Sequence, residues 1–436
     1  MKLLLVNTNR FKTPPAVPVG LEYLITALEN ASHKLEILDL CFSNEPYKDL
    51  RSKILSKAPD IVLLSFRVLD TVLYHNNQCF IGDLLKLVQI THRLNKLVIL
   101  GGAGFSCMPQ EIMEYTKADF GIIGPGEIAL PKLLQELEHS KMPKPEECSK
   151  LIDGYAAGIL PDITHKRGKS FNYLQYIKAG GILGFSSHTG CPEGCIFCPE
   201  AKTRVFYRNP KAVASEIKYI MYQGYREFHL CDSEFNTDLN YCIKLCDELK
   251  LKAPGMRWTA YVKYQPFNPE FFKALKNAGC HMVTLSLETD PGKPYTFQRL
   301  ANFFSFADNA GVNVFVDLLT GFPNEKYEDA QILINFLKTQ PIAKVGVNNY
   351  IRIYPDGKLL KIIEADPGLT KHLIGYKSKT DFICPVFFNW FSDIQVQALI
   401  GNAKNIYLAS NQKACNYQQI KPPKQEKETK IIRRKL

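Results

Sequence analysis

The sequence has 436 residues, of which 46% are hydrophobic and 22% are charged, a composition typical of folded proteins with two or three domains. Its apolar runs are much shorter than the roughly 18 to 20 residues of a membrane-spanning helix, so we expect no transmembrane helix. The net charge of +11 includes +5 from residues 421–436, where seven Lys or Arg stand against two Glu. The rest of the chain is not basic enough to indicate nucleic-acid binding.

The start of the chain, MKLLLVNTNRFK, indicates a strand that breaks into polar residues, and it is too short for a signal-peptide core. Thirteen cysteines without an export signal predict a reducing, cytoplasmic location, where thiols stay free or bind metal. Most of the scattered cysteines are expected to pack as small buried hydrophobic residues.

Residues 1–140 alternate short apolar runs with amphipathic stretches. The runs are KLLLVN, KLEILDL, DIVLLSF, LVILGG and FGIIG. Apolar strands that are each followed by a helix predict a parallel sheet covered on both faces, that is, a Rossmann-like, doubly wound α/β domain. Ligands of such sheets bind beyond the carboxyl ends of the strands. The unusual residues of this region fall there, namely Asn7 and residues 65–67, 101–106 and 124–127.

Residues 141–175 contain clusters of Pro, Lys and Glu and are expected to form a linker. A second alternation over residues 176–360 has six strand-helix units, the last beginning with the expected strand VGVNNYIRIY. This predicts a partial barrel with its chemistry at the carboxyl ends of the strands. Residues 361–416 are expected to form a small C-terminal cap, and residues 417–436 a basic, disordered tail.

Three cysteines lie within GCPEGCIFCPE at residues 190–200, at positions Cys191, Cys195 and Cys198. This spacing lacks the fourth ligand of a tetrahedral zinc site and is not that of a dithiol redox pair. Three thiolates can hold three irons of a 4Fe-4S cluster and leave the fourth iron open for a substrate or cofactor. The alternatives are three unconnected free cysteines, or a zinc site completed by His188 or another remote residue.

The segment CPEGCIFC, with Phe197 just before the last cysteine, resembles the signature loop of the radical SAM superfamily, and it follows the first predicted barrel strand as in that family. The resemblance implies that the three cysteines bind a 4Fe-4S cluster and that S-adenosyl-L-methionine (SAM) chelates the open iron. Electron transfer from the cluster would cleave SAM to methionine and a 5'-deoxyadenosyl radical. An electron donor such as flavodoxin or ferredoxin is then an expected partner.

Polar residues at the ends of later barrel strands match the family's cofactor-binding positions. The segment CDSEFN implies that Asp232 and Glu234 contact the SAM amine, with Asn236 behind them, and SLET implies that Ser286 and Glu288 lie near the ribose or carboxylate of SAM. Each of these residues could instead cap the next helix. Further candidates near the mouth of the barrel are Arg204, Arg208, Asn349 and Arg352.

The first domain resembles the cobalamin-binding domain that precedes the barrel in one large subgroup of radical SAM proteins. The similar segments are TPPAVPVGLEYLITALE, EILDL, LVILGGAGFSCMPQEI and DFGIIGPGEIALPKLL, and with the barrel the resemblance covers residues 1 to about 360. Glycines after two strands would let the backbone approach a flat, bulky ligand. The expected cofactor-binding residues of this domain are Ser65, Arg67, Gly101, Gly102, Gly104, Gly124, Gly126 and Glu127.

The sequence departs from some cobalamin proteins because it has no Asp-x-His-x-x-Gly motif to supply an imidazole ligand to cobalt. His75 lies five residues after Asp70, which is the wrong spacing. Many members of the resembled subgroup lack this motif and bind cobalamin with its lower face unligated. The alternative is a Rossmann-like domain that only packs against the barrel.

Together these features predict a cobalamin-dependent radical SAM enzyme that methylates an unactivated carbon of a small metabolite or lipid. One alternative is a radical cyclisation, rearrangement or oxidation without methyl transfer. A reading from another class is a non-catalytic cobalamin or iron-sulfur sensor. Fold and cofactors do not encode which substrate the cavity accepts.

Overall fold

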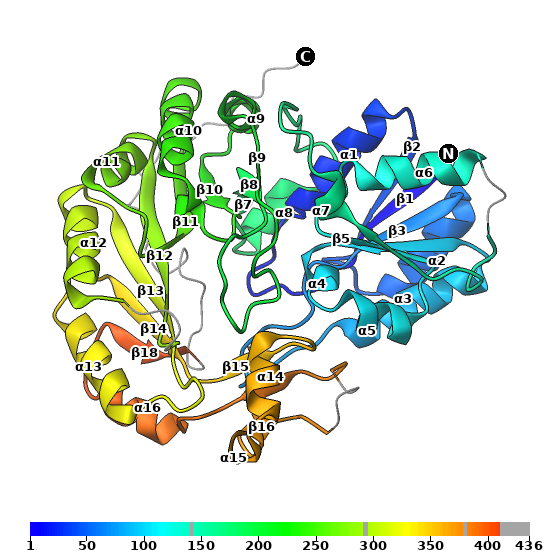
Figure 1. Cartoon of the computed structure of the whole chain (residues 1–436). Coiled ribbons are helices and arrows are strands. Elements are labelled where there is room, and N and C mark those ends of the chain that lie inside the picture. Colours follow the sequence, from blue (N-terminus) through cyan, green and yellow to red (C-terminus); the bar gives the residue numbers. More distant parts are fainter. Residues whose placement is uncertain (140–142, 291–294, 378–381, 410–436) are drawn as a thin grey trace.

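The structure is a computed structural model, which describes residues 1–139, 143–290, 295–377 and 382–409. Two parallel sheets lie side by side, and helices cover both of them (Figure 1). The predicted α/β architecture, a Rossmann-like sheet followed by a partial barrel, is confirmed. The predicted tail at residues 417–436 lies outside the described residues.

The first sheet has six strands, all paired in parallel. The register places Asn7 beside Asp39 and Ser65, so the carboxyl ends of three strands lie at one edge. In spatial order the strands are β2 (Lys34–Asp39), β1 (Lys2–Asn7), β3 (Ile61–Ser65), β4 (Leu97–Gly101), β5 (Phe120–Ile123) and β6 (Lys150–Asp153). The helices of this part are α1 (Val19–Asn30), α2 (Pro46–Lys57), α3 (Ile81–Arg93), α4 (Ala103–Ser106), α5 (Pro109–Thr116) and α6 (Ala129–His139).

The strand β6 comes from the segment that was expected to be a linker. It is a four-residue edge strand whose residues are all exposed or half-buried, so it lacks the continuous apolar run that marks a buried strand. The same segment forms two short helices, α7 (Gly154–Ala157) and α8 (Tyr173–Lys178).

The second sheet is the partial barrel, and all seven of its strands are parallel. In spatial order they are β18 (Ile406–Leu408), β14 (Lys344–Asn348), β13 (Asn313–Leu319), β12 (Cys280–Glu288), β11 (Arg257–Lys263), β10 (Glu227–Leu230) and β7 (Leu183–Phe185). The helices along its wall are α9 (Pro210–Tyr222), α10 (Leu239–Lys252), α11 (Pro269–Asn277), α12 (Phe297–Asn309), α13 (Tyr327–Lys338) and α16 (Asp393–Ile400). The segment expected as a cap thus adds a strand, β18, to the barrel edge.

The expected strand VGVNNYIRIY is wrong as a single element, because the chain turns in its middle. Asn348 Oδ1 accepts a hydrogen bond from Tyr350 N at 3.1 Å, and Asn349 Nδ2 donates to Phe391 O at 2.8 Å. The second half therefore leaves the barrel as β15 (Ile351–Ile353), which pairs with β17 (Val386–Phe388) beside β16 (Leu373–Ile374). The remaining elements are α14 (Lys358–Glu364), α15 (Pro367–Thr370), a 3-10 turn (Phe235–Thr237) and the hairpin of β8 (His188–Thr189) and β9 (Phe206–Tyr207).

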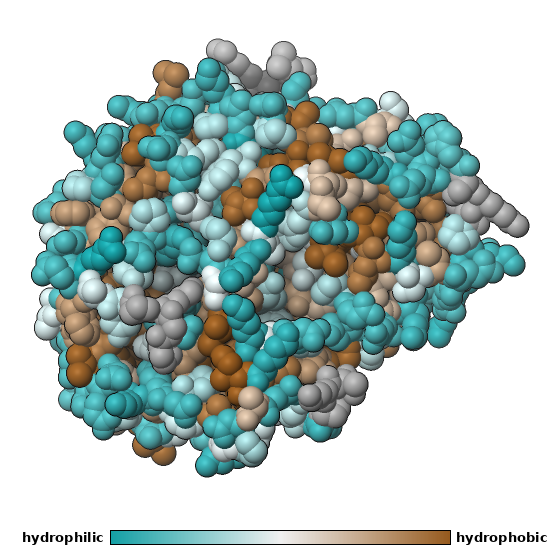
Figure 2. All heavy atoms as spheres, viewed as in Figure 1, coloured by the Kyte–Doolittle hydropathy of each residue, from teal (hydrophilic) through white to brown (hydrophobic). Residues whose placement is uncertain are grey.

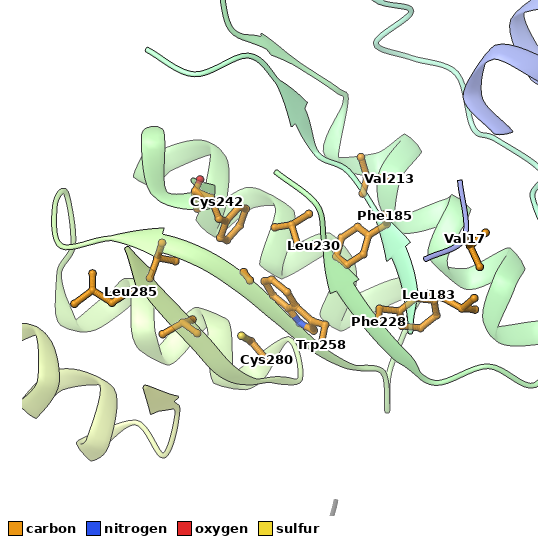
Figure 3. Packing of buried hydrophobic residues seen from close by; sticks show 14 of the residues in the cluster. Val17, Leu183, Phe185, Val213, Phe228, Leu230, Cys242, Trp258, Cys280 and Leu285 are labelled. Carbon is orange, nitrogen blue, oxygen red and sulfur yellow. The ribbon is translucent and has the colours of Figure 1, made fainter. Parts of the chain in front are cut away.

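One hydrophobic core runs from the first sheet through α1 and α6 into the barrel. Figure 3 shows Phe185, Phe228 and Trp258 of three neighbouring barrel strands in this core. Trp258 is fully buried, and its indole N–H donates to Ala278 O at 2.8 Å. Because both sheets share this core, their relative position is fixed by apolar packing.

The outer surface mixes hydrophilic and hydrophobic residues on the face shown in Figure 2. Within the described residues, none of the helices combines the length and the apolar character needed to cross a membrane.

Candidate functional site

A cavity of about 650 Å³ lies between the carboxyl edge of the first sheet and the inner face of the barrel. The first domain contributes the segment before α1 and the residues that follow β3, β4 and β5. The barrel contributes residues of β7, β10, β11 and β12 and part of the loop that carries the cysteine motif. The loop borders the cavity through Gly190 and Glu200. Its three cysteines are not among the lining residues, and neither are Glu234, Ser286 and Glu288.

Most of the predicted first-domain residues border this cavity, namely Ser65, Arg67, Gly101, Gly102, Gly124, Gly126 and Glu127. Gly104 does not, because it packs against the segment after β3. A Cβ at Gly104 would lie 2.8 Å from Leu69 N, and a Cβ at Gly102, whose φ is +103°, would lie 2.8 Å from Phe66 O. These glycines allow two backbone segments to touch. This close packing is a second reason for glycine at these positions, beside the expected approach of a ligand.

The two charged residues of this wall differ in their surroundings. Glu127 is buried, its carboxylate accepts a hydrogen bond from Leu160 N at 2.9 Å, and burial raises its pKa. Arg67 borders the cavity and makes no hydrogen bond or ion pair within the part of the chain that the structure describes. Its guanidinium is therefore available to a bound group, whereas Glu127 already holds the backbone of the β6 region.

The cysteine loop, defined here as residues 190–204, starts and ends at the β8–β9 hairpin. Gly190 has a φ of +86°, and a Cβ there would lie 2.1 Å from Arg204 O, so only glycine fits where the two ends of the loop meet. Inside the loop, Cys191 N donates to Thr203 Oγ1 at 2.8 Å and Lys202 N donates to Glu193 O at 2.7 Å. These bonds shape the segment that presents the three thiols.

The thiols of the loop are near one another but do not form a ready metal site. Burial, followed by the charges of Glu200, Cys195 and Cys191, raises the pKa of Cys198 to about 12. Among the described residues, no group of three or more His, Cys, Asp or Glu side chains is arranged to hold a metal ion. The chemistry of the donor set nevertheless fits a cluster with one open iron, because one loop carries three thiols.

Residues from later parts of the chain also hold the cysteine loop in place. Leu359 N, in α14, donates to Ile196 O at 3.0 Å, and the ring of Phe197 meets that of Phe322 edge to face at 5.9 Å. The aromatic residue of the motif thus ties the loop to the end of the fifth barrel unit.

Asp232 lies behind the cysteine loop and does not border the cavity. Its carboxylate accepts hydrogen bonds from Ser187 N at 2.7 Å and Ser186 Oγ at 2.8 Å, and His188 Nδ1 lies 3.1 Å away. Although burial alone would raise the pKa of Asp232, His188 and the hydrogen bonds from Ser187 lower it. Asp232 therefore holds the turn that leads into the loop.

Asn236 has a similar supporting position. It is fully buried, donates to Lys263 O at 2.8 Å and Pro266 O at 2.7 Å, and accepts from Lys263 N at 2.9 Å. All of its hydrogen bonds go to the end of β11, so it fixes that strand end.

Glu234, Ser286 and Glu288 come together between the ends of β10 and β12. Burial raises the pKa of Glu234 to about 8; a hydrogen bond with Ser286 and the charge of Lys263 oppose this, whereas Glu288 and Glu193 add to it. Glu234 Oε2 is buried and has no hydrogen-bond partner among the described residues. A buried carboxyl oxygen without a donor suits a cationic amine such as that of SAM.

A buried ion cluster that the sequence did not indicate joins the first domain to the barrel. Arg167 Nε lies 2.7 Å from Glu22 Oε2, and Arg167 Nη1 lies 2.8 Å from Glu216 Oε1. Arg208 Nη2 lies 2.7 Å from Glu216 Oε2, and the Tyr23 hydroxyl accepts from Arg208 Nη1 at 2.8 Å. Arg208, a candidate near the barrel mouth, does meet an anionic group, the carboxylate of Glu216, but it is not solvated, because this side chain is only 3% exposed.

A second set of ion pairs joins the first domain to the C-terminal part of the chain. Arg352 Nε lies 3.0 Å from Asp70 Oδ2, and His75 Nε2 lies 2.8 Å from Asp393 Oδ2. Arg352 and Asn349, which were expected near the barrel mouth as site candidates, thus serve this contact and the β14–β15 turn. His75 lies in the loop between β3 and α3.

Comparison with known proteins finds similarity for both the first domain and the barrel. Residues 13–134 match the B12 binding domain family, and residues 185–337 match the radical SAM superfamily. Among curated relatives, tryptophan 2-C-methyltransferase of Streptomyces laurentii is 25% identical over 434 residues, covering 80% of this chain and 72% of the relative. An uncharacterized methyltransferase of Pyrococcus horikoshii is 24% identical and covers 78% of each chain.

Solved structures share the fold. The radical S-adenosylmethionine methyltransferase TsrM of Kitasatospora setae, determined with cobalamin and a [4Fe-4S] cluster bound, superposes with a TM-score of 0.81 at 22% identity, covering 93% of this chain and 90% of TsrM. The cobalamin-dependent radical enzyme OxsB superposes with a TM-score of 0.69 at 14% identity, covering 91% of this chain and 65% of OxsB.

Proposed function

Because the chain belongs to the radical SAM superfamily and carries a B12 binding domain ahead of the barrel, we propose that it is a cobalamin-dependent enzyme that methylates a carbon atom of a small molecule. The observation that carries this proposal is the single cavity bordered by both domains. A methyl carrier held by one domain and a SAM site held by the other can act on one acceptor only if they face the same space.

When bound, the cluster with SAM supplies reductive cleavage of SAM, and cobalamin supplies a transferable methyl group. Cys191, Cys195 and Cys198 would hold the cluster on the cysteine loop. Glu234 and Ser286, with Glu288 beside them, would contact SAM.

The remaining proposed contacts lie on the first-domain wall and would hold cobalamin. Gly101, Gly102, Gly124 and Gly126 border the cavity at the carboxyl edge of the sheet, and Arg67 offers a cation with no partner among the described residues. Asp232 and Asn236 would not contact a cofactor directly. They hold the turn before the loop and the end of β11 in place. The shared core and the two interdomain contacts hold both walls at a set separation.

The relatives suggest the first acceptor to test. One of them is named as a tryptophan methyltransferase, so tryptophan and related indoles are the natural probes for this chain. The thirteen cysteines of the sequence suit a reducing compartment, where thiols stay free or bind metal. We therefore place the enzyme in the cytoplasm, with flavodoxin or ferredoxin as electron donor.

The test uses the full chain purified and reconstituted without air, with SAM whose methyl group is deuterated. We expect labelled methyl to appear in an indole acceptor or in an extract metabolite, and we expect Cys195→Ala to abolish it. Reductive cleavage of SAM without any methyl transfer would favour the cyclisation, rearrangement or oxidation alternative. No reaction of SAM under reducing conditions would favour the sensor.

A further inference from the structure

The barrel side of the cavity carries a regular wall of side chains that the cofactor contacts above do not use. Three neighbouring strands each contribute two residues at alternate positions, so all six point to the same side of the sheet. The register pairs His229 with Thr259, Thr259 with Met282, and Tyr261 with Thr284. This barrel wall consists of His229 and Cys231, Thr259 and Tyr261, and Met282 and Thr284.

The two rings of the barrel wall are fixed in place. His229 Nδ1 and Thr259 Oγ1 lie 2.7 Å apart, and the Tyr261 hydroxyl donates to Asp317 Oδ2 at 3.2 Å. The rings of His229 and Tyr261 meet edge to face, with centroids 5.8 Å apart at an angle of 84°. Hydrogen bonds within the wall and to Asp317 hold the two rings in one orientation before a ligand arrives, so the wall is preorganised.

The barrel wall carries no formal charge near neutral pH. Burial, and next the charge of Arg67 on the facing wall, lower the pKa of His229 to about 4, so the imidazole is neutral. Burial raises the pKa of Cys231, so its sulfur is a thiol. The other members are hydroxyl or thioether groups, so a carboxylate or phosphate would lose its hydration there without meeting a cation on the same wall.

We propose, building on the function proposed above, that the barrel wall recognises the methyl acceptor and that the part it takes is an uncharged aromatic ring. The first-domain wall is the place for cobalamin and the cysteine loop for SAM, which leaves this wall to the acceptor. Its chemistry suits such a ring: Cys231 and Met282 supply polarisable sulfur, and His229 and Tyr261 supply ring edges.

Cys231 provides a reporter that does not depend on turnover. The cobalamin-loaded, reconstituted enzyme is treated anaerobically with N-ethylmaleimide, alone, with indole, or with benzoate as an anionic ring, and labelling of Cys231 is followed by peptide mass spectrometry. Cys79 and Cys384 are exposed and do not border the cavity, so they serve as controls in the same sample. We expect indole to slow labelling of Cys231 several-fold, benzoate to have little effect, and the controls to be unchanged.

Two outcomes would overturn the proposal. In one, indole fails to protect Cys231, or benzoate protects it equally. In the other, cobalamin alone blocks labelling, which would assign the wall to the cofactor. A second measurement uses His229→Leu, which we expect to raise the indole concentration needed for half-protection, with the surface variant Ile332→Ala as control. Indole protection of Cys231 without methyl transfer from SAM would refute the proposed function but not the proposed role of the barrel wall. Methyl transfer without indole protection would refute the role of the barrel wall but not the proposed function.

Discussion

The cysteine loop and the buried ion cluster are built in opposite ways. The loop is half-buried, is shaped mainly by backbone hydrogen bonds, and holds thiols that do not yet form a metal site. In the ion cluster, two arginines and two glutamates are almost completely buried and pair with one another. The ion cluster is a complete structural element without any ligand, whereas the thiols of the loop are proposed to complete their contacts when a 4Fe-4S cluster binds.

Because of this difference, we expect activity to depend on the loop and stability to depend on the ion cluster. Changes in the loop should remove activity and leave the fold intact, because few native contacts depend on the thiols. Changes in the ion cluster should destabilise the fold, because removing one partner leaves a buried charge unpaired.

The largest effect is expected from Cys195→Ala in the loop. We expect reductive cleavage of SAM to fall to background, because one of three sulfur donors is lost, while the free energy of unfolding changes by no more than about 0.5 kcal/mol, as for most partly exposed substitutions. Iron content, SAM cleavage and thermal unfolding, measured on the anaerobic protein, check this. Cys79→Ala is the matched control at an exposed free thiol; an iron-loaded, active Cys195 variant would contradict the assignment.

The next largest effect is expected from Glu216→Gln in the ion cluster. Its carboxylate pairs with both Arg167 and Arg208 at 0% exposure, so we expect a loss of roughly 3 to 5 kcal/mol of unfolding free energy. Glu248→Gln is the control, because Glu248 pairs with Lys252 one helical turn away in a partly exposed site, worth about 0.3 to 0.5 kcal/mol. Equal losses in urea unfolding would show that the ion cluster has no special role.

A smaller, pH-dependent effect is expected at His165, which stacks on Tyr23 of the ion cluster at 4.1 Å. Burial, against the charge of Glu216, lowers the pKa of His165 to about 4, below the ordinary value of 6.5. The neutral ring therefore contributes stability above pH 6.5, and this contribution is lost as the pH falls toward 4.

His165→Phe keeps a stacked ring that cannot take up a proton. We expect the variant to match the native protein at pH 7 and to lose less stability between pH 6.5 and 4, by roughly 1 to 3 kcal/mol. Parallel pH profiles of the melting temperature for the two proteins would refute the role of His165.

The fold could be predicted well because its signals are local. Buried parallel strands such as β1 and β3 appear in the sequence as unbroken apolar runs, whereas the edge strand β6 has none and was missed. The cysteine motif is also local, so its three residues could be singled out from their spacing and their resemblance to a known signature loop, and their role as cluster donors stays a prediction. The ion cluster could not be predicted, because Glu22 and Arg167 lie 145 residues apart and each looks like an ordinary surface charge.

The polar residues at the ends of the barrel strands could be located from the sequence, but their individual roles could not be predicted. Asp232 and Glu234 stand two positions apart in the same segment, yet one holds a turn and the other has a buried oxygen without a partner. Which of two neighbouring carboxylates meets a donor depends on the packing of distant residues such as Ser187 and Ser286, which the sequence does not reveal.

The most direct measurement of whether both cofactors share the cavity is electron paramagnetic resonance of the anaerobic protein loaded with cob(II)alamin and a reduced 4Fe-4S cluster. We expect magnetic coupling between cobalt and the cluster, seen as faster relaxation of the cobalt signal than in a Cys195→Ala sample that holds cobalamin alone. A cobalt signal that is the same with and without the reduced cluster would contradict the shared cavity.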